Sequence, residues 1–223
     1  QIFHWPLILQ KRFPIAAIEI IEQVGERFDI AEATIQQAQQ NKPLIEYSDQ
    51  VETLLVRNLH DESLLECVRN EEDKEFLFTG GGIVPSSLLS VTGSKFIHIH
   101  PGYLPDVRGA DCLLYSILAN GRPSASAFYM APGIDTGDIL LAQWLPELEL
   151  PAIAEADLAT HYRLAYSLVD PWVRAVVLRE LLNQHSAFAA LPGLPQNEAD
   201  GTTYHFMHDK LRRMALDRLF SRS

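Results

Sequence analysis

The chain has 223 residues, of which 47% are hydrophobic, and this is enough apolar material for the core of one large folded domain. Its net charge of −11 disfavours a broad nucleic-acid-binding surface, because phosphates are bound by clustered Lys and Arg. We expect a cytoplasmic protein without a membrane partner, because no stretch approaches the roughly 20 apolar residues of a membrane span, the first residues show no secretory pattern, and the two cysteines form no CxxC motif.

Helical and strand patterns alternate along the chain. Apolar residues at helical spacing predict helices over 15–40 and 54–69, and short apolar runs predict strands over 43–47, 75–79, 95–100, 125–130 and 139–144. From Leu158 onward the pattern is helical, with Asp170 as N-cap and Pro171 as first residue of a helix. The alternation predicts an α/β fold, with a central mixed or parallel sheet flanked by helices and a mostly helical C-terminal third.

Glycines are unevenly placed. The first 79 residues hold only Gly25, so the usual GxGxxG and P-loop motifs of nucleotide-binding units are absent from them. A triple glycine follows at 80–82, before Ile83 and Val84. Such a loop lets the backbone approach a flat ligand, and a plain tight turn is the alternative interpretation.

Two histidines, His98 and His100, stand one residue apart at the end of the predicted strand over 95–100. Successive strand side chains point to opposite faces, so both imidazoles share one face. Pro101 and Gly102 then end the strand, and strand ends are the usual place for a site in an α/β protein. The pair therefore predicts a chemical site, with two core or surface histidines as the alternative.

A second candidate stretch, MAPGIDTGDI, covers residues 130–139. Its glycines Gly133 and Gly137 predict a tight loop directly after a strand, which can carry the Asp135 carboxylate to the histidines. A carboxylate close to an imidazole raises the pKa of the histidine and fixes its tautomer, as general acid or base catalysis requires. Asp138 competes for this role, and either aspartate could instead cap a turn.

Taken in order, the segments GGGIVPSSLL, HPGYLPDVRGAD and GIDTGDIL resemble the folate-dependent formyltransferases. That family has an Asn-x-His-Pro strand end, a Leu-Pro-x-x-Arg-Gly loop and then an aspartate loop, and here 35 residues separate His100 from Asp135. The resemblance covers residues 76–141 and, more weakly, the segment QNEADGTTYHFM at 196–207. It implies a Rossmann-like formyltransferase domain over residues 1–207, followed by a basic helical tail over 208–223.

The resemblance also implies a reaction and its residues. His100 becomes the catalytic histidine and Asp135 its carboxylate partner, in a formyltransferase that uses 10-formyltetrahydrofolate as formyl donor. One histidine held by an aspartate can move a proton from the attacking amine to the departing folate nitrogen, a contribution of roughly 10² to 10⁴ in rate. The pterin ring of the donor would be held by two loops, namely by Gly81, Gly82, Ile83, Val84, Ala131, Pro132, Gly133 and Ile134.

The chain departs from the family in two places. His98 stands where the family has an Asn that donates to the oxyanion, and because a neutral imidazole also offers one N–H, we predict His98 as a third catalytic residue and oxyanion donor. The first 75 residues lack the family's usual opening strand and glycine loop, which disfavours glycinamide ribonucleotide as acceptor. The acidic charge and the lack of length for a separate RNA-binding domain disfavour methionyl-tRNA, so we expect a small amine such as an amino sugar.

Two alternatives stay open at this point. The chain could be a non-catalytic or divergent folate-binding relic of the fold. It could also be a metal-dependent hydrolase in which His98, His100 and Asp135 bind zinc or iron with one position left for water. We expect no metal, and a homodimer is left open.

Overall fold

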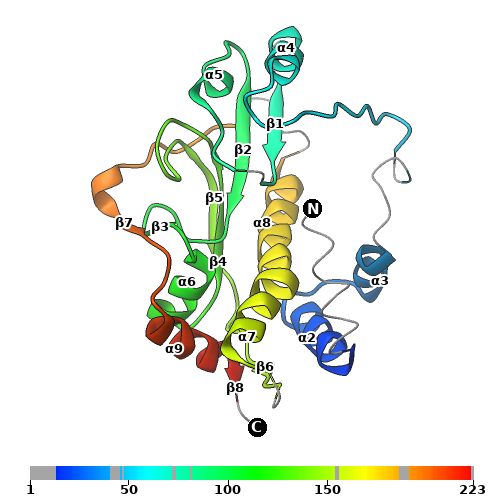
Figure 1. The fold of residues 1–223 in the computed structure, drawn as a ribbon, viewed down its shortest axis with the longest axis vertical. Coiled ribbons are helices and arrows are strands. Elements are labelled where there is room, and N and C mark those ends of the chain that lie inside the picture. Colours follow the sequence, from blue (N-terminus) through cyan, green and yellow to red (C-terminus); the bar gives the residue numbers. More distant parts are fainter. Residues whose placement is uncertain are drawn as a thin grey trace.

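The computed structural model describes residues 14–40, 46, 48–71, 74–80, 82–153, 156–185 and 191–221. At its centre lies a four-stranded sheet with the strand order β1-β2-β4-β5 (Figure 1). The strands are β1 (Glu75–Phe78), β2 (Lys95–His100), β4 (Ser124–Tyr129) and β5 (Ile139–Trp144). β1 and β2 run parallel, whereas β4 is antiparallel to both β2 and β5. The expected Rossmann-like α/β fold with a mixed sheet is confirmed, as are these four predicted strands.

The two central strands, β2 and β4, are the most buried strands of the sheet. Every residue of β4 is buried, and in β2 only Lys95 is exposed. Such continuous burial is typical of strands that are covered on both faces. The register pairs His98 with Phe128 and His100 with Ser126, which places both histidines beside β4.

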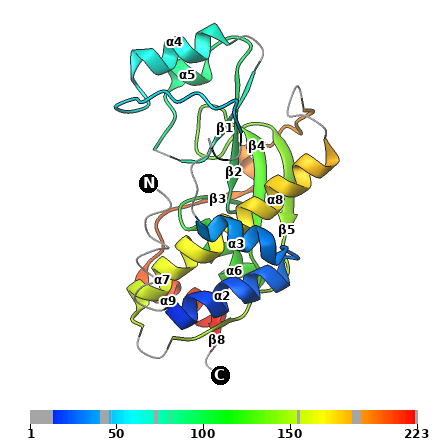
Figure 2. The ribbon, with the colours of Figure 1, turned by 90° about the vertical axis from the view of Figure 1, so that its right-hand side faces the viewer.

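A long helical run covers one face of the sheet. α7 (Leu158–Leu164), a π-helical turn (Ala165–Val169) and α8 (Asp170–Gln184) follow one another without a break. α8 lies against β2, β4 and β5, and α2 (Pro14–Arg27) packs against the π-helical turn (Figure 2). α3 (Glu32–Gln40) follows α2 on the outside of the molecule.

Two further helices lie at the lower end of the domain in Figure 1. α6 (Cys112–Asn120) and α9 (Asp209–Leu219) pack against each other. Two short parallel ladders join distant parts of the chain, β3 (Val107–Gly109) with β7 (Thr202–Tyr204) and β6 (Leu150–Pro151) with β8 (Phe220–Ser221). A 3₁₀ turn (Glu198–Asp200) precedes β7. The β3–β7 ladder therefore ties the segment after the histidines to a segment near the end of the described chain.

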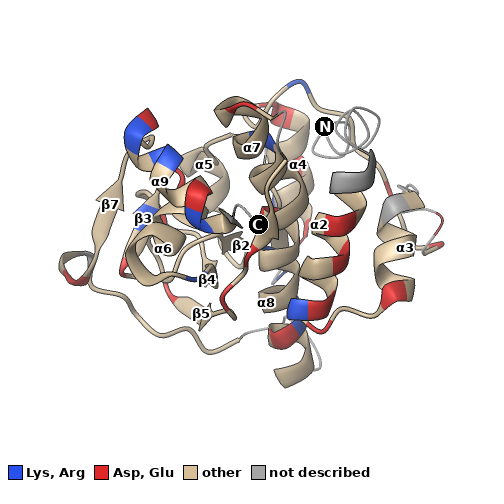
Figure 3. Ribbon diagram, turned by 90° about the horizontal axis from the view of Figure 1, so that it is seen from below, with Lys and Arg blue, Asp and Glu red and all other residues tan. Residues whose placement is uncertain are grey.

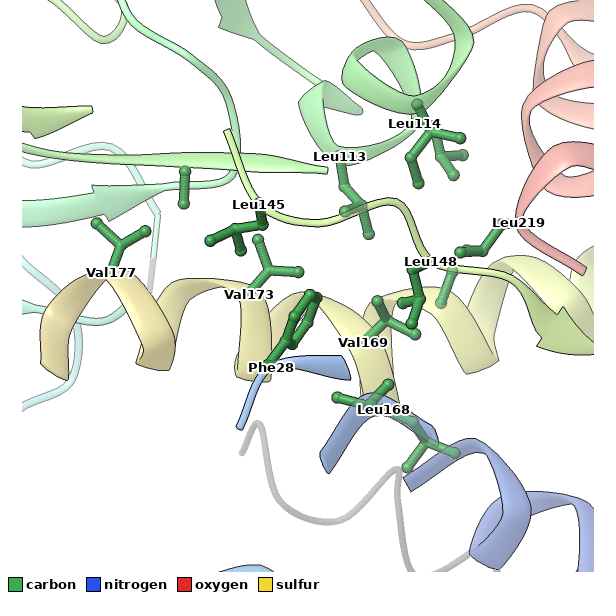
Figure 4. Close-up of a cluster of buried hydrophobic side chains, with 14 of the residues drawn as sticks. Phe28, Leu113, Leu114, Leu145, Leu148, Leu168, Val169, Val173, Val177 and Leu219 are labelled. Atoms are coloured by element: carbon green, nitrogen blue, oxygen red, sulfur yellow. The ribbon is translucent and has the colours of Figure 1, made fainter. Parts of the chain in front are cut away.

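The main core lies between the sheet and the helical run. Figure 4 shows Val173 and Val177 of α8 next to Leu145, with Leu113 of α6 above them and Phe28 below. A second, smaller cluster lies around β1 under α4 (Glu62–Asn70) and α5 (Ser86–Leu89), and it contains Val68, Val84, Leu88 and Phe96. The candidate site lies where β1 and β2 leave this smaller cluster.

Two expected helices differ from the structure. The helix over 54–69 begins only at Glu62, because the Asp61 side chain caps it by accepting a hydrogen bond from the N–H of Ser63 at 3.2 Å. Asp170 is not an N-cap, since the helical run continues through it from α7. Pro171, whose nitrogen has no N–H to donate, closely follows the π-helical turn, where the regular bonding pattern of the α-helix is already interrupted.

Other predictions have simpler outcomes. Residues 15–40 form two helices, not one, and the predicted strand over 43–47 lies almost wholly outside the described residues. In α9, which carries residues of both charges in Figure 3, Ala215, Leu216 and Leu219 are buried. Its other charged residues are exposed, but Arg212 is partly buried, since it lies over the ring of Tyr162 and donates to the carbonyl oxygen of Met207. No helix in the described part of the chain is long and apolar enough to span a membrane.

Candidate active site

His100, at the end of β2, is almost completely enclosed, with 3% of its surface exposed. Its Nδ1 lies 3.4 Å from Oδ2 of Asp135, and its Nε2 lies 3.0 Å from the carbonyl oxygen of Val107. A Cβ at Gly102 would collide with this ring and with the Val107 carbonyl, so only glycine lets the loop close over the histidine. Burial lowers the pKa of His100 from 6.5 to about 4, against the opposing effect of Asp135.

The aspartate loop is tight because of its two glycines. Gly133 and Gly137 have φ angles of 124° and 111°, which other residues rarely adopt. A Cβ at Gly133 would also collide with the side chain of Thr136, and one at Gly137 with the carbonyl oxygen of Tyr129. The sequence pattern around the aspartate thus reflects backbone geometry.

Asp135 reaches the histidine from this loop. It has a φ of 52°, a left-handed conformation that aspartate tolerates better than most side chains. Its Oδ2, which faces His100, also accepts a hydrogen bond of 2.8 Å from the N–H of Gly109. Asp138, the competing candidate, is exposed. The structure therefore brings Asp135, and not Asp138, to the histidine.

His98 lies two residues before His100 in β2 and is half-buried. Its Nδ1 is 2.8 Å from the carbonyl oxygen of Phe78 in the neighbouring strand β1. The rings of Phe78 and Phe128 lie at centroid distances of 5.7 and 5.9 Å on either side. Burial lowers the pKa of His98, and the Phe78 carbonyl only partly offsets this.

A cavity of about 300 Å³ opens beside His98. It is lined by both loops that the resemblance assigns to the pterin ring: Gly82, Ile83, Val84, Ala131, Pro132, Gly133 and Ile134. The eighth predicted residue, Gly81, lies outside the described residues. His98 and Asp135 also line the cavity, with Phe78, Ser86, Leu89, Phe128 and Met130 completing its wall. Residues far apart in the sequence thus share one cavity.

Two features of the site differ from a simple picture of paired histidines. His100 does not line the cavity, since the segment from Gly102 to Val107 covers its ring. Both histidines direct a ring nitrogen at a backbone carbonyl, and among the residues that the structure describes no group of three His, Cys, Asp or Glu side chains could hold a metal ion. The hydrolase alternative therefore has no ligand cluster in the described chain.

Sequence reasoning missed the role of Gln196. Its Nε2 donates to the carbonyl oxygens of Asp135 at 3.1 Å and Gly137 at 2.7 Å. These hydrogen bonds join residues that are 61 and 59 positions apart, so no local sequence pattern predicts them. The only sequence signal was the position of Gln196 at the start of the segment over 196–207.

Asp111, which follows the LPDVRG loop, was also missed. Its carboxylate accepts hydrogen bonds from the hydroxyls of Tyr162 at 2.7 Å and Tyr166 at 3.1 Å and from the N–H of Met207 at 2.8 Å. Burial raises the pKa of both tyrosines, so their hydroxyls stay protonated donors. This buried aspartate joins the motif to α7, the π-helical turn and the segment before α9.

Comparison with known proteins gives homologues of one kind. The chain is 30% identical over 155 residues to a methionyl-tRNA formyltransferase of Syntrophus aciditrophicus, an alignment that covers 68% of this chain and 46% of the relative. It is 38% identical over 64 residues to a methionyl-tRNA formyltransferase of Orientia tsutsugamushi, covering 28% and 21% of the two chains. The chain thus spans less than half the length of these curated relatives. No family model matches it.

Among solved structures, a methionyl-tRNA formyltransferase from Clostridium thermocellum has a TM-score of 0.48 at 18% identity, over 85% of this chain and 79% of that one. HypX from Aquifex aeolicus has a TM-score of 0.46 at 20% identity, over 75% of this chain and 27% of that one.

The sequence homology carries the assignment. The Syntrophus alignment covers more than two thirds of the chain, so it necessarily includes residues 98–135, which hold both histidines and the aspartate loop. With a cavity formed by the loops that carry the resemblance, the conclusion follows that the chain belongs to the folate-dependent formyltransferase family.

Proposed function

We propose that the chain transfers a formyl group from 10-formyltetrahydrofolate to a small amine. The observation that supports this most directly is the cavity beside β2. The two loops assigned to the donor by resemblance, remote from each other in sequence, line it together with His98 and Asp135. Binding and reacting groups therefore face the same space.

The residues present suit the flat ring of a reduced folate. A volume of about 300 Å³ lies at the lower end of the range for small-molecule sites. The wall consists mainly of apolar side chains and loop backbone, which fits an aromatic ring with polar edges. Ile83 and Ile134 are 92% and 59% exposed at its two loops, and they would cover apolar surface on the bound donor.

The chain's own groups would bind the donor, exclude water and move one proton. The formyl carbon is supplied by the bound donor, and attack by a neutral amine leaves an oxyanion and a proton that must go to the departing nitrogen. His98, His100 and Asp135 are the residues to which we assign this work. Asp135 sits between the cavity and the enclosed His100, so it can act on both.

For the acceptor we propose an amino sugar, including nucleotide-linked ones. The net charge of −11 works against a large polyanion such as tRNA, because phosphates bind where Lys and Arg gather. Acidic residues colour α2 and α3 in Figure 3, and α9 carries both signs. A small acceptor needs only the mouth of the cavity.

Calorimetry with 5-formyltetrahydrofolate tests the donor site, and turnover assays with 10-formyltetrahydrofolate test the acceptor. We expect binding in the parent, and loss of binding in Ile134→Asp, which places a charge at the cavity. Leu194→Asp, at a leucine that is 72% exposed and does not line the cavity, is the matched control. A parent that binds no reduced folate would overturn the proposal, and one that binds without turning over any amine would be a binding relic.

The acceptor panel should contain a UDP-linked 4-amino sugar, glycinamide ribonucleotide and methionyl-tRNA. We expect turnover with the amino sugar alone. Turnover with methionyl-tRNA would keep the formyl transfer and reject the amino-sugar acceptor.

A further inference from the structure

We propose that His98, and not His100, is the group that takes the proton from the attacking amine, and that His100 is a positioning residue. This inference rests on the proposed formyl transfer. It reverses the roles expected from the sequence, where His100 moves the proton and His98 donates to the oxyanion.

The tautomer of His98 follows from its partner. A carbonyl oxygen can only accept, so the 2.8 Å contact with Phe78 means that Nδ1 carries the proton. In the neutral ring, Nε2 then holds a lone pair and is an acceptor. No hydrogen bond of Nε2 to a described residue is recorded, and the ring lines the cavity. The Nε2 of a neutral His98 can therefore accept a proton as a base, but it has no N–H to donate to an oxyanion.

The surroundings of His98 keep it in this form. Burial lowers its pKa, and Arg174 of α8 acts in the same direction, whereas the Phe78 carbonyl and Asp135 raise it. Arg174 is held in place by an ion pair of 2.8 Å with Asp170 and by a bond of 3.2 Å to the carbonyl of Ile99. At pH 7 the ring is ready to accept a proton, and Asp135 can stabilise the imidazolium that forms.

His100 lacks the same freedom. Both of its nitrogens face acceptors, the Val107 carbonyl at 3.0 Å and Asp135 at 3.4 Å, and 3% of its surface is exposed. It also does not line the cavity that His98 and Asp135 line. Instead it joins the backbone of the segment after β2 to the aspartate. His100 therefore fixes where the Asp135 carboxylate lies relative to His98.

The proposed step balances without any further reactant. The amine lone pair forms the new C–N bond, and the electron pair of the carbonyl moves to its oxygen. The amine proton goes to Nε2 of His98. The imidazolium then returns this proton to the folate nitrogen as that C–N bond breaks and the carbonyl re-forms, which leaves His98 neutral again.

Nitrogen NMR of the histidine rings tests the proposal without relying on turnover. In the free protein at pH 7, His98 should show a protonated Nδ1 and an unprotonated Nε2. Addition of 5-formyltetrahydrofolate should shift the Nε2 signal of His98 and leave the ring signals of His100 almost unchanged. His60, which is exposed and does not line the cavity, is the reference. The opposite tautomer, or a ligand shift confined to His100, would overturn the proposal.

Turnover of 10-formyltetrahydrofolate with the amino-sugar acceptor gives the second readout. His98→Asn restores the residue found in the family, yet we expect it to lower kcat by about 10² to 10⁴, the usual contribution of a general base. Because His98 is one of many residues in the cavity wall, its effect on folate binding should be much smaller than its effect on kcat. In the same variant, the fall of kcat at low pH that comes from protonation of His98 (the acid limb of the pH profile) should disappear. His100→Asn should lower kcat but keep that limb. Full turnover in His98→Asn would show that an oxyanion donor is all the position needs.

The two proposals fail in different ways. Loss of folate binding in the parent defeats the formyl transfer, whereas folate binding with the wrong histidine responding defeats only the assignment of the base.

Discussion

The side-chain amide of Gln196 donates to the backbone carbonyl of Asp135 at 3.1 Å, across 61 residues of chain. The same nitrogen donates to Gly137 at 2.7 Å, so a single side chain holds the loop at two points. The carboxylate of Asp135 is thereby positioned by a residue that never touches the cavity.

Gln196→Ala should loosen the aspartate loop. Loss of these bonds leaves two loop carbonyls without their donor, which costs roughly 1 to 2 kcal/mol of unfolding free energy. We expect kcat to fall more than folate affinity, measured by turnover and calorimetry. Gln184→Ala, which removes only an exposed bond within α8, is the control and should change neither. Equal behaviour of the two variants would contradict the role of Gln196.

Asp135→Asn should abolish most turnover while the fold persists. Asparagine tolerates the left-handed φ of 52° and can still accept from the N–H of Gly109, but it carries no charge to stabilise a histidinium. The thermal midpoint should stay close to that of the parent. The same change at the exposed Asp138 should leave kcat unchanged, and a loss there instead would assign the carboxylate role to Asp138.

Ser126→Ala should damage the site through the loop after β2. The Ser126 hydroxyl donates to the carbonyl of Gly102 at 2.7 Å and accepts from the N–H of Leu104 at 2.9 Å, so its loss strands two buried groups at roughly 1 to 3 kcal/mol each. Ser116→Ala, which breaks the buried Ser116–Ser124 pair at 2.8 Å, matches it in burial. Urea unfolding should show both variants destabilised, while only Ser126→Ala should shift the His100 ring signals.

The enclosed His100 predicts a loss of stability in acid. Its pKa is about 4 when folded and 6.5 when exposed, so below pH 6.5 the unfolded chain binds the extra proton. This contribution is complete above pH 6.5 and disappears as pH falls toward 4, a total of roughly 3 kcal/mol. Urea unfolding of His100→Asn between these pH values should show a shallower decline than the parent. Parallel curves would mean that His100 is not enclosed in solution.

The strands and the site loops were predictable because their signals are local. The alternation in β2 and the glycines around Asp135 each record a constraint within a few residues, and the resemblance supplied the distance between them. The position of the cavity did not follow from the strand order alone. β4 runs antiparallel to β2, so the loop after β4 starts beside Phe96 near the beginning of β2, and it must fold back for Asp135 to reach His100 at the end of β2.

The contacts that decide the chemistry could not be predicted in the same way. The tautomer of His98 depends on a carbonyl of β1, 20 residues away, and the enclosure of His100 depends on how the next loop folds back. The extent of α4 and the continuity of the helix through Asp170 depend similarly on competing local caps and on packing against the sheet. Sequence patterns thus identify the candidate residues, whereas contacts with residues distant in the sequence determine which ring nitrogen carries a proton.

The β3–β7 ladder can form only after most of the chain has been synthesised, because β7 lies near its C-terminal end. A nascent chain that has emerged to residue 195 already holds every strand of the central sheet, both histidines and Asp135. It still lacks Gln196 on the aspartate loop and β7 beside Gly109. Because domains fold progressively as they leave the ribosome, the sheet can assemble before Gln196 and β7 hold the Asp135 loop and Gly109 in place, so the candidate site is completed after the strands that carry it.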